Sequence, residues 1–360
     1  MNKFILTGCD LHDKTMLLKI AVGQDTPVKR SFTNDVDGRK TMIADLKKRA
    51  KECGVERIIF AYEAAGLGFG LHDELKENGI ICHVLAPSKM ARSPKHRRGK
   101  TDEKDAEHIL EILRGHYLAG NKLPSVWIPD KQTRDDRELV RARLDTQEKS
   151  VVVKCQVQTL LKRNSVRPST SLGGAWTKTH RAWLKALSEC DEPLAFGARQ
   201  NLASLLRQMD SLETEIITLD KEIAKLSQAK RYAKSVKKLI KMKGVGLLGA
   251  MVFLTEMGDL SRFKNRKQIG AYLGLVPSSD ESGETDDKKG HITHQGSPRL
   301  RYMLCQMVWN RVRYDAREKI VYERIAARNP KHKKIAVVAA MRRLAIEMWH
   351  VASSAKKDAA

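Results

Sequence analysis

Short apolar runs separated by polar turns fill the first 120 residues, and this alternation restricts the fold more than any other feature of the chain. Apolar runs of strand length lie at residues 4–9, 16–22, 57–62 and 80–85, and residues 28–32 add a further strand. Between them, apolar residues recur at helical spacing around 42–50 and 71–78. Three strands, a helix, a strand, a helix and a strand predict an α/β domain with a mixed sheet and helices packed on it.

A basic segment precedes the next predicted helix. Residues 87–100 contain no acid and six basic residues: Lys89, Arg92, Lys95, Arg97, Arg98 and Lys100. This composition fits either a solvated loop or a loop that contacts phosphate, and in the second case the last four of these residues bind nucleic acid. A helix then begins at Thr101 and Asp102, with an apolar stripe at residues 106, 109, 110 and 113.

The second region, residues 126–235, is predicted to be helical. Between Lys149 and Ser188 there are eight basic residues and no acid, so Lys162, Arg163 and Arg167 are candidate contacts with a nucleic-acid backbone. Residues 202–226 then carry apolar side chains at alternating steps of three and four for four heptads. This seam favours a coiled coil, formed by self-association or with a long antiparallel helix, although a hairpin within one chain needs the same stripe.

The third region, residues 236–360, begins with Gly244 and Gly246 between two apolar segments. Glycines at this place let backbone amides approach a phosphate, as in helix-hairpin-helix DNA-binding elements, and an ordinary glycine turn is the alternative. A serine-rich acidic stretch and a basic helical tail follow. We therefore expect this region to be mostly α-helical.

Charge and composition narrow the class of protein. The formal net charge is +24, an excess that points to a polyanion such as nucleic acid as the partner. Apolar runs all fall short of the roughly 18–20 residues that span a bilayer, and the first ten residues lack the order of a secretory signal. We expect a cytoplasmic protein with no membrane partner. The six cysteines are far apart, which argues against a disulfide framework or a zinc ribbon.

Four acids occupy places that could bring their carboxylates together. Asp10 and Glu63 each end a predicted strand, and Asp102 and Asp105 share one face of the helix start. Taken singly, Asp10 is a turn residue and Glu63 is a charge at the end of a strand. Asp102 is then a helix cap, with Asp105 as its partner in the first turn. Gathered in one cleft they would need divalent cations, as in Mg²⁺-dependent phosphoryl transfer on nucleic acid.

Several segments resemble the insertion sequence 110 family of transposases, which includes the Piv-type DNA invertases. The DEDD-motif resemblance rests on G-C-D-L-H at residues 8–12, Y-E-A-A-G at 62–66 and K-T-D-E-K-D-A at 100–106. The carboxy-terminal resemblance rests on residues 243–301, with G-V-G, G-D-L-S-R-F, Y-L-G-L-V-P, E-S-G and G-S-P-R-L-R, the last containing Arg299 and Arg301. We count both arginines, with the glycines of G-V-G, as candidate nucleic-acid contacts.

The resemblance implies a RuvC-like catalytic domain of ribonuclease H type at 1–125, a coiled-coil linker and assembly region at 126–235, and a transposase domain at 236–360. It makes Asp10, Glu63, Asp102 and Asp105 the acidic, metal-binding quartet. It makes Ser282, before Gly283, the catalytic serine, with Ser278 and Ser279 as alternatives. It also implies a homo-oligomer, dimer or tetramer, that binds donor DNA, target DNA and an element-encoded guide RNA.

The expected function is that of an RNA-guided, Mg²⁺-dependent DNA recombinase that cleaves and rejoins strands through a serine nucleophile. A RuvC-like nuclease or junction resolvase would use the same acids with water and leave free ends. A non-enzymatic coiled-coil scaffold for nucleic acid would keep its binding when all four carboxylates are lost.

Overall fold

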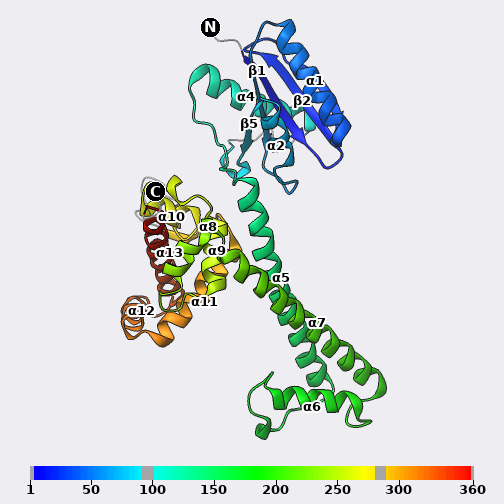
Figure 1. Ribbon diagram of the computed structural model, residues 1–360, viewed down its shortest axis with the longest axis vertical. Coiled ribbons are helices and arrows are strands. Elements are labelled where there is room, and N and C mark those ends of the chain that lie inside the picture. The colour runs from blue at the N-terminus through cyan, green and yellow to red at the C-terminus, as the bar shows by residue number, and fades with distance from the viewer. Residues whose placement is uncertain (1–3, 91–100, 280–288, 358–360) are drawn as a thin grey trace. The chain divides into compact units, whose positions relative to one another are not determined.

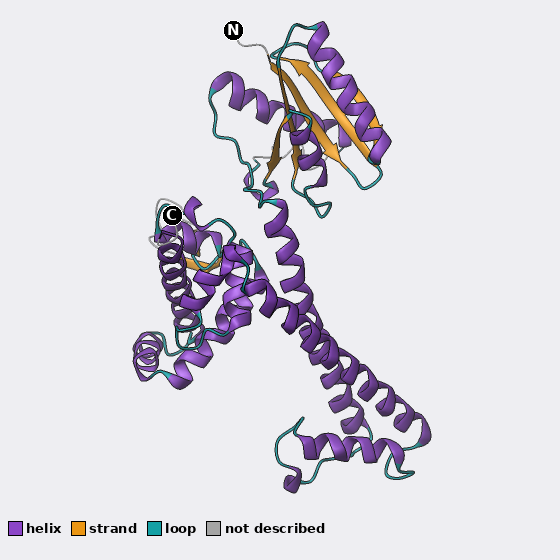
Figure 2. Cartoon of the chain, viewed as in Figure 1, coloured by secondary structure: helices purple, strands orange, loops and turns teal. Residues whose placement is uncertain are grey.

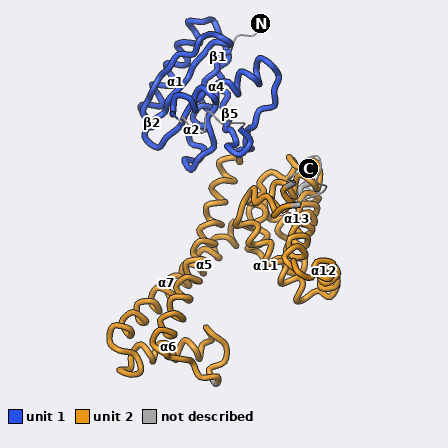
Figure 3. Tube along the Cα trace, turned by 180° about the vertical axis from the view of Figure 1, so that it is seen from behind, with its two compact units in different colours: residues 1–128 blue, residues 129–360 orange. Residues whose placement is uncertain are grey.

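The computed structural model describes residues 4–90, 101–279 and 289–357 (Figure 1). The chain divides into two compact units, residues 1–128 and residues 129–360 (Figure 3). The first unit is α/β and the second is mostly helical, as the colouring by secondary structure shows (Figure 2).

A mixed five-stranded sheet forms the centre of the first unit. Its strands are β1 (Phe4–Leu11), β2 (Thr15–Val22), β3 (Val28–Thr33), β4 (Arg57–Glu63) and β5 (Ile81–Leu85), in the order β3-β2-β1-β4-β5. The first three strands form antiparallel pairs, whereas β4 pairs in parallel with β1 and with β5. The predicted mixed sheet is confirmed, and it is compatible with a ribonuclease H type domain.

Helices cover both faces of this sheet. On one face lie α1 (Val36–Glu52) and α2 (Gly70–Glu77), whose residues share a core with Ile5 and Cys9 of β1. On the other face lies α4 (Asp102–Ala119), which packs on Leu6 of the same strand. The apolar stripe predicted for α4 is buried as expected, at residues 106, 109, 110 and 113. Alternation along β1 therefore directs even-numbered side chains toward α4.

In the second unit, α5 (Lys131–Arg163) and α7 (Phe196–Ser227) pack antiparallel, and α6 (Lys178–Glu189) packs on α7. The two ends of the seam on α7 are buried, at Leu202 and Leu205 and again at Ile223, whereas its middle, with Leu212, is only partly buried. The face of α5 toward that middle is polar, and Arg143 donates from Nε to Oδ1 of Asp220 at 2.7 Å. The seam is thus covered by a helix of the same chain, and self-association stays a prediction.

The rest of the second unit surrounds one apolar helix, α9 (Leu247–Met257), whose residues are buried from Gly249 onward. The elements around it are α8 (Lys230–Leu239), α10 (Arg266–Tyr272), α11 (Pro298–Tyr314), α12 (Ala316–Arg328), α13 (Lys334–Lys357) and the short strand pair β6 (Pro277–Ser279) and β7 (Lys289–Ile292). In the described part of the chain, every helix is too short or too polar to cross a membrane.

Candidate metal centre

Asp10 and Glu63 lie at the ends of neighbouring strands, at the same edge of the sheet. The parallel register of β1 and β4 runs from Phe4 with Arg57 to Cys9 with Tyr62. Asp10 and Glu63 are the next residue on each strand, so the backbone sets these two acids side by side. The parallel pairing thus accounts for the placement of half of the predicted quartet.

Helix α4 reaches this edge because β1 carries a glycine where the helix crosses it. A Cβ atom on Gly8 would lie 2.2 Å from the carbonyl oxygen of Ala106 and 2.5 Å from the amide nitrogen of Leu110. The cap of α4 is Thr101, whose hydroxyl accepts from the Lys104 amide at 3.4 Å. Reading Asp102 as the cap was therefore wrong, because the threonine one position earlier has the extended backbone that a cap needs.

His12 connects the strand end to the helix start. Its Nε2 lies 2.9 Å from Oδ2 of Asp10 and 3.6 Å from Oδ1 of Asp102. One ligand atom from each of these three residues falls within 4.8 Å of the others, and among the described residues this close group excludes Glu63 and Asp105. His12 ends the G-C-D-L-H segment but is not among the predicted metal ligands. Its position two residues after Asp10, on the same side of an extended chain, was the available signal.

The electrostatics of the group suit a cation. Burial raises the pKa of the Asp10 carboxyl, and the negative charges of Asp102 and Asp105 raise it further, while His12 lowers it. Asp10 is 17% exposed, whereas His12 and Asp102 are open to solvent, so a bound ion would keep positions for substrate oxygens. Two carboxylates and an imidazole are ligands that divalent metals accept. The donor set therefore fits a divalent metal ion.

Glu103, a third acid in the first turn of α4, points toward β2 and β3. Glu103 accepts hydrogen bonds from Nζ of Lys19 at 2.6 Å and from Nζ of Lys29 at 2.7 Å. These bonds lower the pKa of Glu103 to about 2. Glu103 is thus held to β2 and β3, whereas Asp102, one residue earlier in the helix, lies within 3.6 Å of His12.

Several predicted residues lie outside the described ranges or away from the metal group. Ser282 falls outside the described residues, as do four basic candidates: Lys95, Arg97, Arg98 and Lys100. Ser278, an alternative to Ser282, is on β6 and donates from Oγ to the carbonyl oxygen of His291 at 3.1 Å.

The remaining nucleic-acid candidates lie in the second unit. Lys162, Arg163 and Arg167 are exposed at the end of α5. Arg301 donates from Nη1 to three backbone carbonyl oxygens, those of Leu273, Gln295 and Gly296. Its guanidinium is thus engaged in holding the turn before α11.

The two glycines of G-V-G differ in their surroundings. Gly244 has φ of +77° and a Cβ on it would lie 2.9 Å from the carbonyl oxygen of Met307 on α11, whereas Gly246 precedes α9 with open space around it. Close packing against α11 is enough to explain why position 244 is a glycine.

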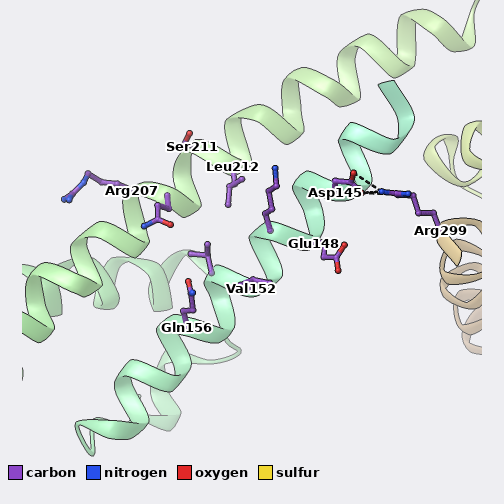
Figure 4. Close-up of a pocket in the computed structure, with 11 residues that line it drawn as sticks. Asp145, Glu148, Val152, Gln156, Arg207, Ser211, Leu212 and Arg299 are labelled. Atoms are coloured by element: carbon purple, nitrogen blue, oxygen red, sulfur yellow. Dashed lines mark hydrogen bonds and ion pairs between the residues drawn. The ribbon is translucent and has the colours of Figure 1, made fainter. Parts of the chain in front are cut away.

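A groove of about 1030 Å³ runs between α5 and α7 (Figure 4). Arg299 of α11 closes one end through a bidentate ion pair with Asp145, with Nη2 2.8 Å from Oδ1. The walls mix acidic, basic and apolar side chains, including Glu148, Arg207 and Val152. Arg299, predicted to contact nucleic acid, thus pairs with a carboxylate of its own chain.

Two models of known protein families match segments of this chain. Residues 236–323 match the model described as "Transposase IS116/IS110/IS902 family", and residues 7–165, which contain the metal group, match a DEDD model described as "Transposase". The chain is 32% identical over 255 residues to y4qE of Sinorhizobium fredii, a protein named as a transposase, covering 71% of this chain and 58% of that relative's length. It is 23% identical over 319 residues to the transposase for insertion sequence element IS1533 of Leptospira borgpetersenii, covering 86% of each.

Proposed function

Because this chain belongs to the IS110 family of transposases, we propose that it is an enzyme that cuts and rejoins DNA to move an insertion element. The observation that carries the proposal is the group of Asp10, His12 and Asp102 at the open edge of the sheet. Such a group suits phosphoryl transfer on nucleic acid, in which bound divalent cations stabilise the charge of the reacting phosphate.

We propose that Mg²⁺ is the metal, with Asp10 and Asp102 as its first ligands and with Glu63 and Asp105 completing the acidic quartet. When bound, the ion would supply charge stabilisation for the reacting phosphodiester. His12 orients the Asp10 carboxylate through the 2.9 Å contact. The open sides of His12 and Asp102 leave room for the DNA strand.

Ser282 is the proposed nucleophile. Its oxygen forms a bond to phosphorus as one DNA oxygen leaves; the hydroxyl proton goes to a carboxylate and the leaving oxygen takes up a proton. Rejoining reverses these steps with the hydroxyl of another strand, so no water is consumed and the phosphodiester is conserved. Conservation of the phosphodiester distinguishes a recombinase from a nuclease, which uses the same acids to hydrolyse the bond. We further propose that donor and target DNA are chosen by an element-encoded guide RNA.

The test of the metal centre compares three purified variants on a donor DNA in Mg²⁺ with the flanking element RNA. Asp10→Asn and Asp102→Asn should each lower strand cleavage by at least about 100-fold, because a lost carboxylate ligand raises the barrier to the chemical step. Asp37→Asn, an exposed acid on α1 of the same unit, is the matched control and should cleave normally. Near-normal cleavage by Asp10→Asn would remove the metal assignment.

The serine is tested on the same DNA. Ser282→Ala should bind RNA and DNA but give neither a protein–DNA adduct nor a joined product. If the adduct disappears only in Ser279→Ala or only in Ser278→Ala, that serine is the nucleophile in place of Ser282. Free ends that persist in all three variants would favour the RuvC-like nuclease, and binding with no cleavage in the wild type would favour the scaffold.

We also propose that copies of the chain assemble along the outer sides of α5 and α7. These helices belong to the assembly region at 126–235, which joins the catalytic domain at 1–125 to the transposase domain at 236–360. Val151 and Ile217 are apolar and about half exposed there. Val151→Lys with Ile217→Lys should lower the mass measured by light scattering without unfolding the pair, since both side chains are about half exposed. Glu148→Lys with Glu215→Lys gives a control with exposed changes on the same helices. An unchanged mass in the apolar variant would argue against this interface.

A further inference from the structure

Exposed aromatic side chains concentrate on α11. Aromatic residues make up 5% of the chain. Tyr302, Trp309 and Tyr314, all on this one helix, are 55%, 45% and 72% exposed. The other large exposed aromatics of the described residues, Trp127 and Phe196, are each on a different segment. Singly exposed apolar residues need no explanation, but three on one helix indicate a binding surface.

Two of these rings lie on one face of the helix. Tyr302 and Trp309 are seven residues apart, which is two helical turns and about 10 Å along the axis, and Arg313 continues the same face. The ring of Trp309 also meets the ring of Tyr322 on α12, with centroids 5.6 Å apart and planes inclined by 61°. This contact holds the indole in place while its other side remains open to solvent.

The arginines of α11 and α12 separate into paired and unpaired groups. Arg311 is buried and donates to Glu347 at 2.8 Å and to Glu318 at 2.9 Å, which ties α11 to α12 and α13. Arg313 is exposed, and it makes no ion pair within the described part of the chain. The same holds on α12 for three exposed arginines that share one side of the helix: Arg317, Arg324 and Arg328.

Helix α12 contributes surface and no core, because none of its residues is buried. Cationic side chains without acidic partners repel one another, so a helix of this kind is better explained by an external anion than by its own packing. Aromatic platforms beside unpaired guanidinium groups are the combination that binds a single strand of nucleic acid, whose bases are free to stack and whose phosphates are exposed.

We propose that the exposed face of α11 binds single-stranded DNA, with bases stacking on Tyr302 and Trp309 and phosphates pairing with Arg313, while the arginines of α12 add positive charge to the neighbouring helix. A duplex offers its phosphates but hides its base faces, so it would use the arginines alone. A second copy of the chain would bring like charges together, which disfavours that occupant. The choice of DNA rests on the proposed function, because cutting and rejoining a duplex exposes unpaired strands.

The experiment measures binding of labelled 20-nucleotide strands to the full chain by fluorescence anisotropy, with single-stranded DNA, duplex DNA and RNA of one sequence. Trp309→Leu keeps an apolar contact with Tyr322 and removes the aromatic face. It should weaken single-stranded DNA binding about 5- to 140-fold, the value of one stacked base, while duplex binding changes less than about twofold. Trp309→Phe should retain most of the affinity, which separates stacking from a loss of fold.

Controls keep the outcome independent of the chemistry in the first unit. Phe196→Leu removes another exposed aromatic ring from the second unit and should leave the affinity unchanged. Measuring the affinity in EDTA keeps the metal centre out of the readout, and Asp37→Asn, an exposed acid of the first unit, should bind the single strand as tightly as the wild type does. Equal losses on duplex and single strand, unchanged affinity in Trp309→Leu, or tighter binding of the RNA strand would each overturn the proposal. The proposal would also be overturned if Trp309→Leu lowered the mass measured by light scattering and left the affinity for single-stranded DNA unchanged.

Discussion

A Cβ atom on Gly8 would lie 2.5 Å from the amide nitrogen of Leu110, so α4 can rest on β1 only where the strand has no side chain. The close approach places the first turn of the helix beside Asp10, two residues farther along the strand. The separation of strand and helix thus sets how near the acids of α4 come to Asp10.

Gly8→Ala should therefore affect both stability and metal binding. The methyl group would overlap the backbone of α4, which cannot rotate away as a side chain could, and we expect a cost of about 2–3 kcal/mol or more in the free energy of unfolding. Gly66→Ala is the control, because a Cβ there meets nothing within 4 Å. Urea unfolding of both variants measures the difference, and equal stability would show that α4 can shift without cost.

His12→Asn should weaken binding of a divalent ion by about 10- to 100-fold, the usual effect of losing a ligand or its orienting partner. The asparagine amide can still hydrogen-bond to Asp10 but is a poorer ligand than imidazole. Calorimetric titration of the full chain with Mn²⁺ gives the affinity. His332→Asn, at an exposed histidine in the second unit, should bind the ion normally. If His12→Asn also binds normally, the histidine has no part in the site.

The ion pair between Arg181 of α6 and Glu213 of α7 predicts a pH dependence. The Arg181 guanidinium hydrogen-bonds to Glu213 and lowers its pKa. The pair therefore contributes its full stability above the unfolded pKa of about 4.3 and loses it as the pH falls through the lower folded pKa.

Glu213→Gln should cost roughly 1 kcal/mol at pH 7, since both side chains are partly exposed, and almost nothing at strongly acid pH. Glu215→Gln changes an exposed acid on the same helix and should have little effect at either pH. Urea unfolding at the two pH values gives the comparison. A cost that persists in acid would mean that packing, and not charge, is lost.

Lys162, Arg163 and Arg167 are exposed at the end of α5 and should contribute to the salt dependence of nucleic-acid binding. Changing all three to glutamine should flatten the slope of log affinity against log salt by about two to three units, close to one per phosphate contact. The matched control changes three exposed lysines of α1, Lys40, Lys48 and Lys51. The same flattening in both variants would mean a diffuse effect of net charge.

Local patterns in the sequence predicted the first unit closely. The stripe of α4 and the apolar run of β1 follow from residues a few positions apart, and both are buried in the structure. The role of Gly8 depends on a helix that begins more than 90 residues later, so no local pattern indicates it. His12 was missed for a related reason, because its significance depends on Asp102, which is distant in the chain.

The partner of the apolar seam on α7 was also hard to predict. The seam reads as a regular heptad repeat, but α5 faces its middle with Arg143, Thr146 and Ser150, so the facing helix lacks the matching repeat. Pairing there relies on the bond from Arg143 to Asp220, which only the folded chain brings together.

The hydrogen bonds from Lys19 and Lys29 to Glu103 restrict which substitutions these three positions can accept during evolution. Glu103 is held by two lysines from different strands, and it is flanked by residues that the proposed chemistry needs. A mutation at position 103 would leave Lys19, which is largely buried, without its counter-charge. We expect positions 19, 29 and 103 to vary together among relatives, so that a lineage that loses the glutamate also loses the lysines, while Asp102 and Asp105 persist.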